Sequence, residues 1–162
     1  MAGLPRTDAT ERFWREFRDA TRVPVNDYDV VSFGDNAALA TELAELVVSG
    51  RKRATAGLLR QFSPDGEPPP VVGGYVLLVD GEAQPRAIWR TTELRIGPLV
   101  SVDEQFAWDE GEGDRSRDWW LSAHRGYFGR LASAQGFWMH DEIETVFERF
   151  TVVWPSEIAD GR

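Results

Sequence analysis

The sequence predicts an α+β fold, a small and mostly antiparallel β-barrel with helices around it. Several short apolar runs have the turn boundaries of strands, and the helical segments do not alternate regularly with them. The chain has 162 residues, 42% of them hydrophobic, which is enough for one packed core and too short for two ordinary domains. We therefore expect a single structural domain.

The first predicted elements are a helix and a strand. Residues 8–22 carry aromatic residues at helical spacing, which predicts an amphipathic helix. A short strand is expected around Val30 and Val31. The chain thus divides into a helix and lead-in at residues 1–28, packed on the core, and the main domain at residues 29–162.

A second helix is predicted at residues 37–49. Its leucines and valines lie on one stripe, and Gly50, a residue type favoured just past a helix end, follows it. Asp35 or Asn36 is placed to cap its start. Residues 54–62 are expected to enter a strand.

The second half of the chain is expected to contain most of the sheet. The run SPDGEPPP at residues 63–70 is a predicted loop, because it is rich in Pro, Gly and Asp. Strands are expected at residues 75–79 and 86–96, and a closing strand at residues 145–154. Between them, residues 117–133 have the periodicity of a long helix.

Charge and composition limit the partners and the compartment. The net charge of −9 argues against a long duplex nucleic acid, since such proteins neutralise phosphates with a basic surface. A nucleoside or a short single strand fits better. The longest apolar runs are far too short to cross a bilayer, and the chain has no cysteine and no secretory signal at its start. We expect a cytoplasmic protein that is not bound to membranes.

Common catalytic motifs are absent from the sequence. His124 and His140 are the only histidines, and their spacing does not resemble a metal-ligand set. No GxSxG motif occurs, and the glycines of the EGEGD run do not follow an apolar strand. We expect no metal and no cofactor.

Lys52 is the only lysine of the chain, beside 17 arginines, and it lies two residues past a predicted helix end. A lysine can lose its proton when it is buried or close to other cations, whereas an arginine effectively cannot. Arg51 and Arg53 would lower the pKa of Lys52 if their side chains stay close. Alternatively, the three cations simply interact with the carbonyls at the end of the helix.

Lys52, Thr55 and an acidic segment could together support acyl transfer. A neutral lysine can take the proton of a threonine hydroxyl, and a carboxylate can pass protons to a leaving amine. The segment at residues 104–116 is polar and punctuated by glycine. Its acidic residues are Asp109, Glu110, Glu112 and Asp114. They could also form only a solvated turn in which Asp114 or Ser116 caps the next helix.

The order of GRKRAT, GEPPPVVGG, EQFAWDEGEGDRSRDWW and ERFTVV resembles the bacterial ASCH domain of the PUA-like group, over residues 29–154. The resemblance implies a β-barrel with surrounding helices and a cleft that Lys52 faces. Relatives of this type have been associated with RNA binding, cleavage of single-stranded RNA and hydrolysis of N4-acetylcytidine. In the last case a Lys-x-x-Thr pair and a downstream glutamate are catalytic, which corresponds to Lys52, Thr55 and Glu110, chosen over Glu112.

If the ligand is single-stranded RNA, further residues would bind it in the same cleft. Arg51, Arg53 and Arg60 would hold phosphate, Trp108 would stack on a base, and Glu112 would border the cleft. Our first expectation is an amide hydrolase acting on a free nucleoside. The alternatives are RNA binding or ribonuclease activity through the same cleft, or a ligand-binding module without catalysis, as a monomer or weak homodimer.

Overall fold

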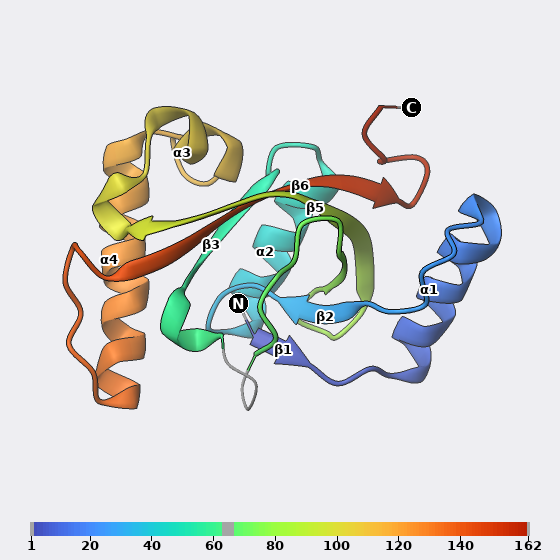
Figure 1. Ribbon diagram of the computed structural model, residues 1–162, viewed down its shortest axis with the longest axis horizontal. Coiled ribbons are helices and arrows are strands. Elements are labelled where there is room, and N and C mark those ends of the chain that lie inside the picture. Colours follow the sequence, from blue (N-terminus) through green and yellow to red (C-terminus); the bar gives the residue numbers. More distant parts are fainter. Residues whose placement is uncertain (1, 63–66, 162) are drawn as a thin grey trace.

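One curled sheet with helices around it makes up the computed structural model, which describes residues 2–62 and 67–161 (Figure 1). Residues 63–66 of the predicted loop therefore lie outside the described part. The strands are β1 (Ala2–Leu4), β2 (Asp29–Ser32), β3 (Ala54–Leu58), β4 (Tyr75–Val79), β5 (Pro85–Pro98) and β6 (Glu144–Trp154). The α-helices are α1 (Asp8–Thr21), α2 (Ala37–Val48), α3 (Glu104–Glu110) and α4 (Arg117–Gln135).

The strands form a half-barrel in the order β1-β2-β4-β5-β6-β3. All neighbours are antiparallel except β2 and β4. Register shifts after Ile88 and after Thr91 interrupt the ladder between β5 and β6. Such bulges increase the local twist, which helps the long strand β5 to curl. The predicted α+β class and the mostly antiparallel sheet are confirmed.

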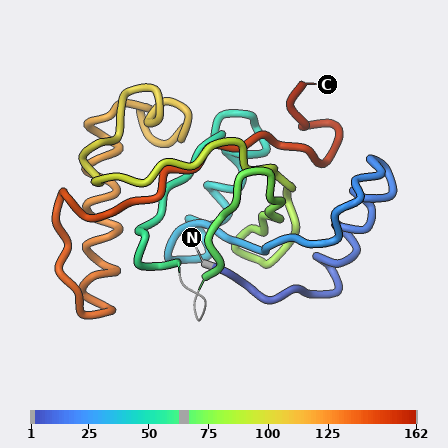
Figure 2. Tube along the Cα trace, in the orientation of Figure 1, coloured from blue at the N-terminus to red at the C-terminus, as the bar shows by residue number. Residues whose placement is uncertain are grey.

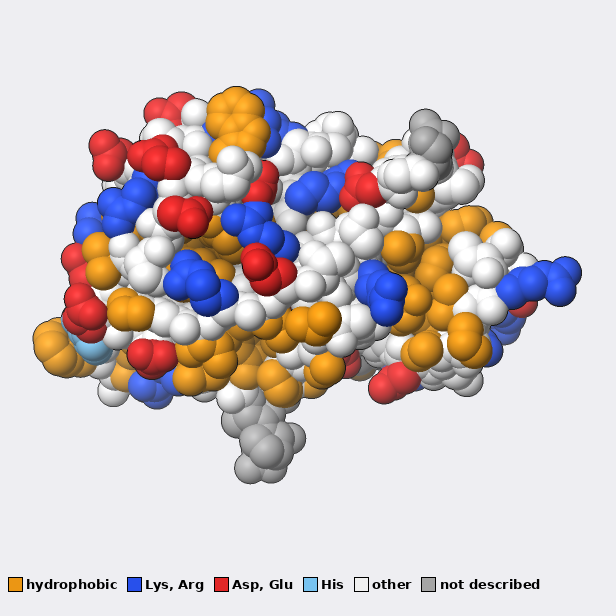
Figure 3. All heavy atoms as spheres, turned by 45° about the horizontal axis from the view of Figure 1, so that its top comes forward, with side chains coloured by type: hydrophobic (Ala, Val, Ile, Leu, Met, Phe, Trp, Pro, Cys, Tyr) orange, Lys and Arg blue, Asp and Glu red, His pale blue; other side chains and the backbone are white. Residues whose placement is uncertain are grey.

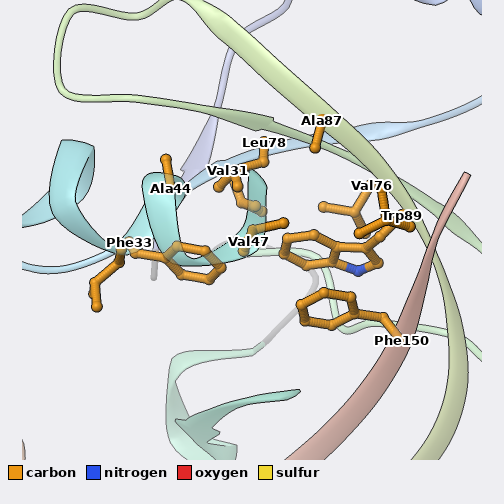
Figure 4. Close-up of a cluster of buried hydrophobic side chains, with 11 residues drawn as sticks. Val31, Phe33, Ala44, Val47, Val76, Leu78, Ala87, Trp89 and Phe150 are labelled. Carbon is orange, nitrogen blue, oxygen red and sulfur yellow. The ribbon is translucent and has the colours of Figure 1, made fainter. Parts of the chain in front are cut away.

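The core beneath α2 is built on Trp89 at the centre of β5. Its indole is fully buried and stacks between the rings of Phe33 and Phe150, with centroid distances of 5.8 and 4.1 Å (Figure 4). Leu43 and Val47 of α2 pack on the same cluster. Parallel-displaced aromatic contacts of this kind add to the free energy gained by burying the rings.

The other helices cover the two ends of the sheet (Figures 1 and 2). Helix α1 packs Trp14 and Phe17 onto a buried cluster that includes Leu77 of β4. At the opposite end, α3 and α4 pack around Phe147 of β6. The site described below lies where α3 and α4 meet the segment between α2 and β3.

Most of the predicted elements are confirmed within two or three residues, and the alternatives for two caps are resolved. Asn36 caps α2 by accepting the N–H of Leu39, and Ser116 caps α4 by accepting the N–H of Trp119. Among the strands and α-helices of the described residues, two were not predicted. One is β1, and the other is α3, which begins within the segment that we expected to be a loop.

Helix α3 forms because its ends are well capped and one face is buried. The carboxylate of Asp103 accepts the N–H of Phe106, and Gly111 ends the helix in the left-handed conformation. Phe106, Ala107 and Glu110 share the buried face at spacings of one and four residues. Within residues 2–62 and 67–161, no helix has both the length and the apolar composition that a membrane span requires.

A buried carboxyl group, Glu148, lies opposite Thr55 in the ladder between β3 and β6. It is 2% exposed, and its Oε2 accepts hydrogen bonds from Thr91 Oγ1 at 2.7 Å and Trp89 Nε1 at 3.0 Å. Burial raises the pKa of Glu148, although these hydrogen bonds oppose the shift. As the pH rises, the unfolded chain loses this proton at about pH 4.3, whereas the folded protein keeps it to a higher pH. The contribution of Glu148 to the free energy of unfolding therefore falls as the pH rises above about 4.3.

Glu148→Gln is therefore expected to raise the free energy of unfolding more at pH 8 than at pH 4.5. The amide oxygen of glutamine can still accept from Thr91 and Trp89, while the charge is removed. Urea unfolding at both pH values measures this, with the exposed Glu144→Gln of the same strand as the control. An equal change at the two pH values would contradict the prediction.

Candidate functional site

Lys52 is buried although it lies just past the end of α2. Gly50 takes a left-handed φ of +89°, and the N–H of Lys52 returns to the carbonyl of Leu46 at 3.0 Å. The next N–H, of Arg53, donates to the carbonyl of Asp109 at the end of α3. These bonds turn the chain inward, and Lys52 is only 1% exposed.

The Lys52 ammonium lies between two carboxyl groups. Its Nζ donates to Glu110 Oε2 at 3.1 Å and to Glu112 Oε2 at 2.8 Å. Glu110, in the last turn of α3, is 1% exposed. These are charge-assisted hydrogen bonds, which are stronger than neutral ones. The interpretation of the acidic segment as a solvated turn is therefore wrong for Glu110 and Glu112.

Two glycines allow the loop after α3 to deliver Glu112. Gly111 has a φ of +75°, and a Cβ there would lie 2.4 Å from the carbonyl oxygen of Arg51. Gly113 has a φ of +58°, and a Cβ there would meet the indole of Trp119 at 2.2 Å. Only glycine fits such close approaches at positive φ. The EGEG run is thus explained by packing at the site.

The three charged groups set one another's protonation. Burial lowers the pKa of Lys52, but the charges of Glu110 and Glu112 and their hydrogen bonds outweigh it, and the net shift is upward. Burial would raise the pKa of Glu112, yet Lys52 and the shared hydrogen bonds lower it to about 2. Burial raises the pKa of Glu110 well above its usual range, and the charge of Glu112 adds to this. At neutral pH the cluster therefore contains the Lys52 ammonium and the Glu112 carboxylate, and Glu110 keeps its proton to a higher pH than an ordinary glutamate does.

This finding corrects the expectation of a neutral lysine. Arg51 and Arg53 do not lower the pKa of Lys52, because their guanidinium groups are engaged elsewhere. Arg51 donates to the carbonyls of Gly111 and Gly113 at 2.6 and 2.8 Å. Arg53 donates to the carbonyl of Val47, in the last turn of α2, and pairs with the carboxylate of Asp160. The alternative prediction, that these cations bind carbonyl groups at the end of the helix, is thus confirmed for Arg53.

A cavity of about 180 Å³ opens in front of this cluster. Its walls come from the turn after β2, from α2, β3, the end of α3 and α4. The polar and aromatic residues among its lining are Phe33, Lys52, Thr55, Glu110, Glu112, Trp119, His124, Tyr127 and Arg130. A cavity of similar size in another protein holds benzene, so this one accommodates a single ring with a small substituent.

Thr55 brings a hydroxyl group to the same cavity. It lies on β3, three residues after Lys52, and is 5% exposed. The ring of Phe33 also lines the cavity, and Lys52 Nζ lies 5.1 Å from its centroid. Lys52, Thr55 and Glu110 therefore border one space, and Glu112 joins them.

His124 is a polar residue of the cavity to which the sequence analysis gave no role. Its ring stacks on Trp120 at a centroid distance of 3.7 Å, and its Nε2 lies 3.7 Å from Glu110 Oε2. Burial lowers its pKa to about 4, so the imidazole is neutral at pH 7. The spacing of Trp120, His124 and Phe128 by four residues is the sequence signal that could have placed it on the inner face of the helix.

Glu110, Glu112 and His124 present ligand atoms within 4.8 Å of one another, a spacing that a metal ion could use. However, the Lys52 ammonium already lies between the two carboxyl groups and balances the charge of Glu112. A metal ion would have to displace this buried cation. We therefore infer that the Lys52 ammonium, and not a metal ion, supplies the positive charge of this site.

Of the predicted binding residues, Glu112 lines this cavity, and Arg51, Arg53, Arg60 and Trp108 do not. Arg60 lies over the ring of Phe137 at 3.8 Å and borders a separate open groove. Trp108 is 53% exposed and is covered by the guanidinium of Arg115 at 3.9 Å. The aromatic side chains that α4 does place in the cavity wall are Trp119, His124 and Tyr127.

The two remaining acidic residues of the segment have structural partners. Asp109 forms an ion pair with Arg149 of β6. Asp114 accepts the N–H of Ser116 at 2.8 Å, next to the start of α4. For Asp114 the predicted solvated turn is therefore correct, although Ser116 and not Asp114 caps α4.

Comparisons with known proteins identify similar folds. A family model described as the ASCH domain matches residues 29–154. The crystal structure of an ASCH domain from Lactobacillus crispatus JV V101 has a TM-score of 0.81 and 28% sequence identity, covering 91% of this chain and 95% of that one. A protein from Enterococcus faecalis V583 has a TM-score of 0.79 and 34% identity, covering 90% and 92%. None of the curated proteins compared matches the chain.

Proposed function

Because this chain belongs to the ASCH domain family, with its PUA-like fold, we propose that it hydrolyses the acetyl amide of N4-acetylcytidine as a free nucleoside. The observation that carries the proposal is the meeting of Lys52, Thr55 and Glu110 at one cavity, where burial raises the pKa of Glu110. These residues supply a nucleophile, a cation and an acid, which are the groups that amide cleavage requires.

The size and charge of the site favour a small substrate. The cavity of about 180 Å³ suits a pyrimidine with an acetyl group. On the face that includes α3, basic and acidic side chains are interspersed, without one continuous basic stripe (Figure 3). A long polyanion would gain little from such a surface.

In the first step, Thr55 Oγ attacks the acetyl carbonyl carbon. The Thr55 proton passes to the Glu112 carboxylate as the new C–O bond forms. The Lys52 ammonium stabilises the negative oxygen of the tetrahedral intermediate. Glu110 then donates its proton to N4 while the C–N bond breaks, so cytidine leaves and the acetyl group stays on Thr55. The cluster gains one proton and loses one, and its net charge is unchanged.

In the second step, water attacks the acetyl-threonine ester. Glu110, now a carboxylate, takes a proton from the water, as expected when an acid of the first step becomes the base of the second. Thr55 recovers its proton from Glu112 as the ester bond breaks. Acetic acid leaves and ionises to acetate in the solvent, and the cluster returns to its resting charges.

Glu110→Gln is expected to lower the rate of acetate release by about 10² to 10⁴-fold, because glutamine cannot donate the proton to N4. Acetate release from N4-acetylcytidine is measured at pH 7 for the wild type and the variant. The control is Glu104→Gln, an exposed residue of the same helix. Unchanged turnover in Glu110→Gln would exclude Glu110 as the acid.

Single-stranded RNA is the alternative ligand. The three arginines proposed to hold its phosphates are dispersed: Arg51 binds the loop at Gly111, Arg53 pairs with Asp160, and Arg60 lies on Phe137. None of them lines the cavity. For this reason the nucleoside is our proposal, and RNA serves as a parallel substrate in the test below.

A further inference from the structure

The tautomer of His124 follows from its contacts. Its Nδ1 lies 2.8 Å from the backbone carbonyl oxygen of Trp120, one turn earlier in α4. A carbonyl oxygen can only accept, so Nδ1 carries the proton. In the neutral imidazole, Nε2 is then unprotonated and can only accept a hydrogen bond.

Nε2 of His124 is a free acceptor in a cavity where three other side chains offer donors. Its distance of 3.7 Å to Glu110 Oε2 is too long for a hydrogen bond. Lys52 offers an ammonium, Thr55 a hydroxyl and Glu110 an acidic proton. The carboxylate of Glu112 is already bound to Lys52. A ligand with an N–H group therefore finds its acceptor at His124.

We propose that His124 accepts the N–H of the substrate amide through Nε2, and that this contact makes the site selective for secondary amides. The inference rests on the proposed function and names a specificity-determining residue within it. A buried N–H without an acceptor is strongly disfavoured, so a site built around this contact discriminates against amides that lack the hydrogen.

The same contact orients the leaving nitrogen. When the carbonyl carbon becomes tetrahedral, N4 loses its amide resonance and carries a lone pair. With the N–H held by His124, the lone pair is turned toward Glu110, whose carboxyl lies beside the imidazole. The acid proton can then be transferred as the C–N bond breaks.

Two substitutions separate this role from packing on Trp120. His124→Asn keeps an N–H near the Nδ1 position for the Trp120 carbonyl but lacks an acceptor at Nε2. His124→Gln reaches the Nε2 position with an amide oxygen. His140→Asn is the matched control, because His140 stacks on the exposed Trp138 and does not line the cavity.

The test compares kcat/KM for N4-acetylcytidine and N4-acetyl-N4-methylcytidine, which differs by replacing the N–H with a methyl group. For the wild type we expect a preference for the N–H substrate. His124→Asn is expected to lower the rate on that substrate by about 10 to 100-fold and to leave the methylated one unchanged. His124→Gln restores part of the loss, and His140→Asn changes neither rate. An equal loss on both substrates would overturn the inference while the proposed function stands.

A binding measurement keeps the two proposals distinguishable if no hydrolysis is seen. The ¹⁵N resonance of His124 Nε2 is recorded with each nucleoside added to the wild-type protein. A shift with N4-acetylcytidine alone, without turnover, supports the histidine contact and overturns the hydrolase. The absence of both a shift and turnover overturns both proposals.

Discussion

Lys52→Met is expected to abolish acetate release and to destabilise the protein by about 3 to 5 kcal/mol. The substitution removes the cation that stabilises the tetrahedral intermediate and leaves the Glu112 carboxylate, which is only 15% exposed, without its partner. Loss of one partner of a buried ion pair is costly because the remaining charge is uncompensated. The two effects are measured separately, by acetate release and by urea unfolding at pH 7.

The stability effect should shrink at low pH. Glu112 has a pKa of about 2 in the folded protein, lowered from about 4.3, so the ion pair stabilises the fold above pH 4.3 and this contribution is lost as the pH falls toward 2. Arg15→Met, on the exposed face of α1, removes the same charge without touching the site. Turnover retained in a folded Lys52→Met protein would contradict the account.

Thr55→Val is expected to lower acetate release by at least about 10³-fold with little change in stability. Valine keeps the branched shape of threonine in β3 but has no hydroxyl to attack the carbonyl. Thr55→Ser keeps the hydroxyl and should retain measurable turnover. Mass spectrometry of the quenched reaction should find an acetyl group on the peptide that contains Thr55, and none in Thr55→Val.

The outcome that would contradict a nucleophilic Thr55 is turnover in Thr55→Val equal to that of the wild type. Water would then attack the amide directly, and Lys52 and Glu110 alone would carry the chemistry. The valine variant is informative only if it is folded, which its unfolding midpoint in urea would establish.

The sequence alone predicted the helices and strands that have strong local signals. The helices at α1, α2 and α4 have periodic apolar stripes and good capping residues, and the strands β4 and β6 are apolar runs between turns. Helix α3 was missed because its 7 residues are mostly polar and its buried face, including Glu110, is defined by contacts with distant strands.

The charge state of Lys52 could not be predicted from its neighbours in the chain. Arg51 and Arg53 suggested a lowered pKa, but the groups that decide it are Glu110 and Glu112, about 60 residues away. The direction of the Arg51 and Arg53 side chains depends on the loop at Gly111 and on Asp160, which only the fold brings near. Lys52 and Thr55 were paired from the residues themselves, and the choice of Glu110 as their catalytic partner came from the family resemblance.

The most direct test of the central claim is acetate release from N4-acetylcytidine by the wild-type protein, with a single-stranded RNA oligonucleotide incubated in parallel. The account predicts acetate and cytidine in equal amounts, lost in Lys52→Met and Thr55→Val, and an intact oligonucleotide. No acetate from the nucleoside, or acetate release that both variants retain, would contradict it.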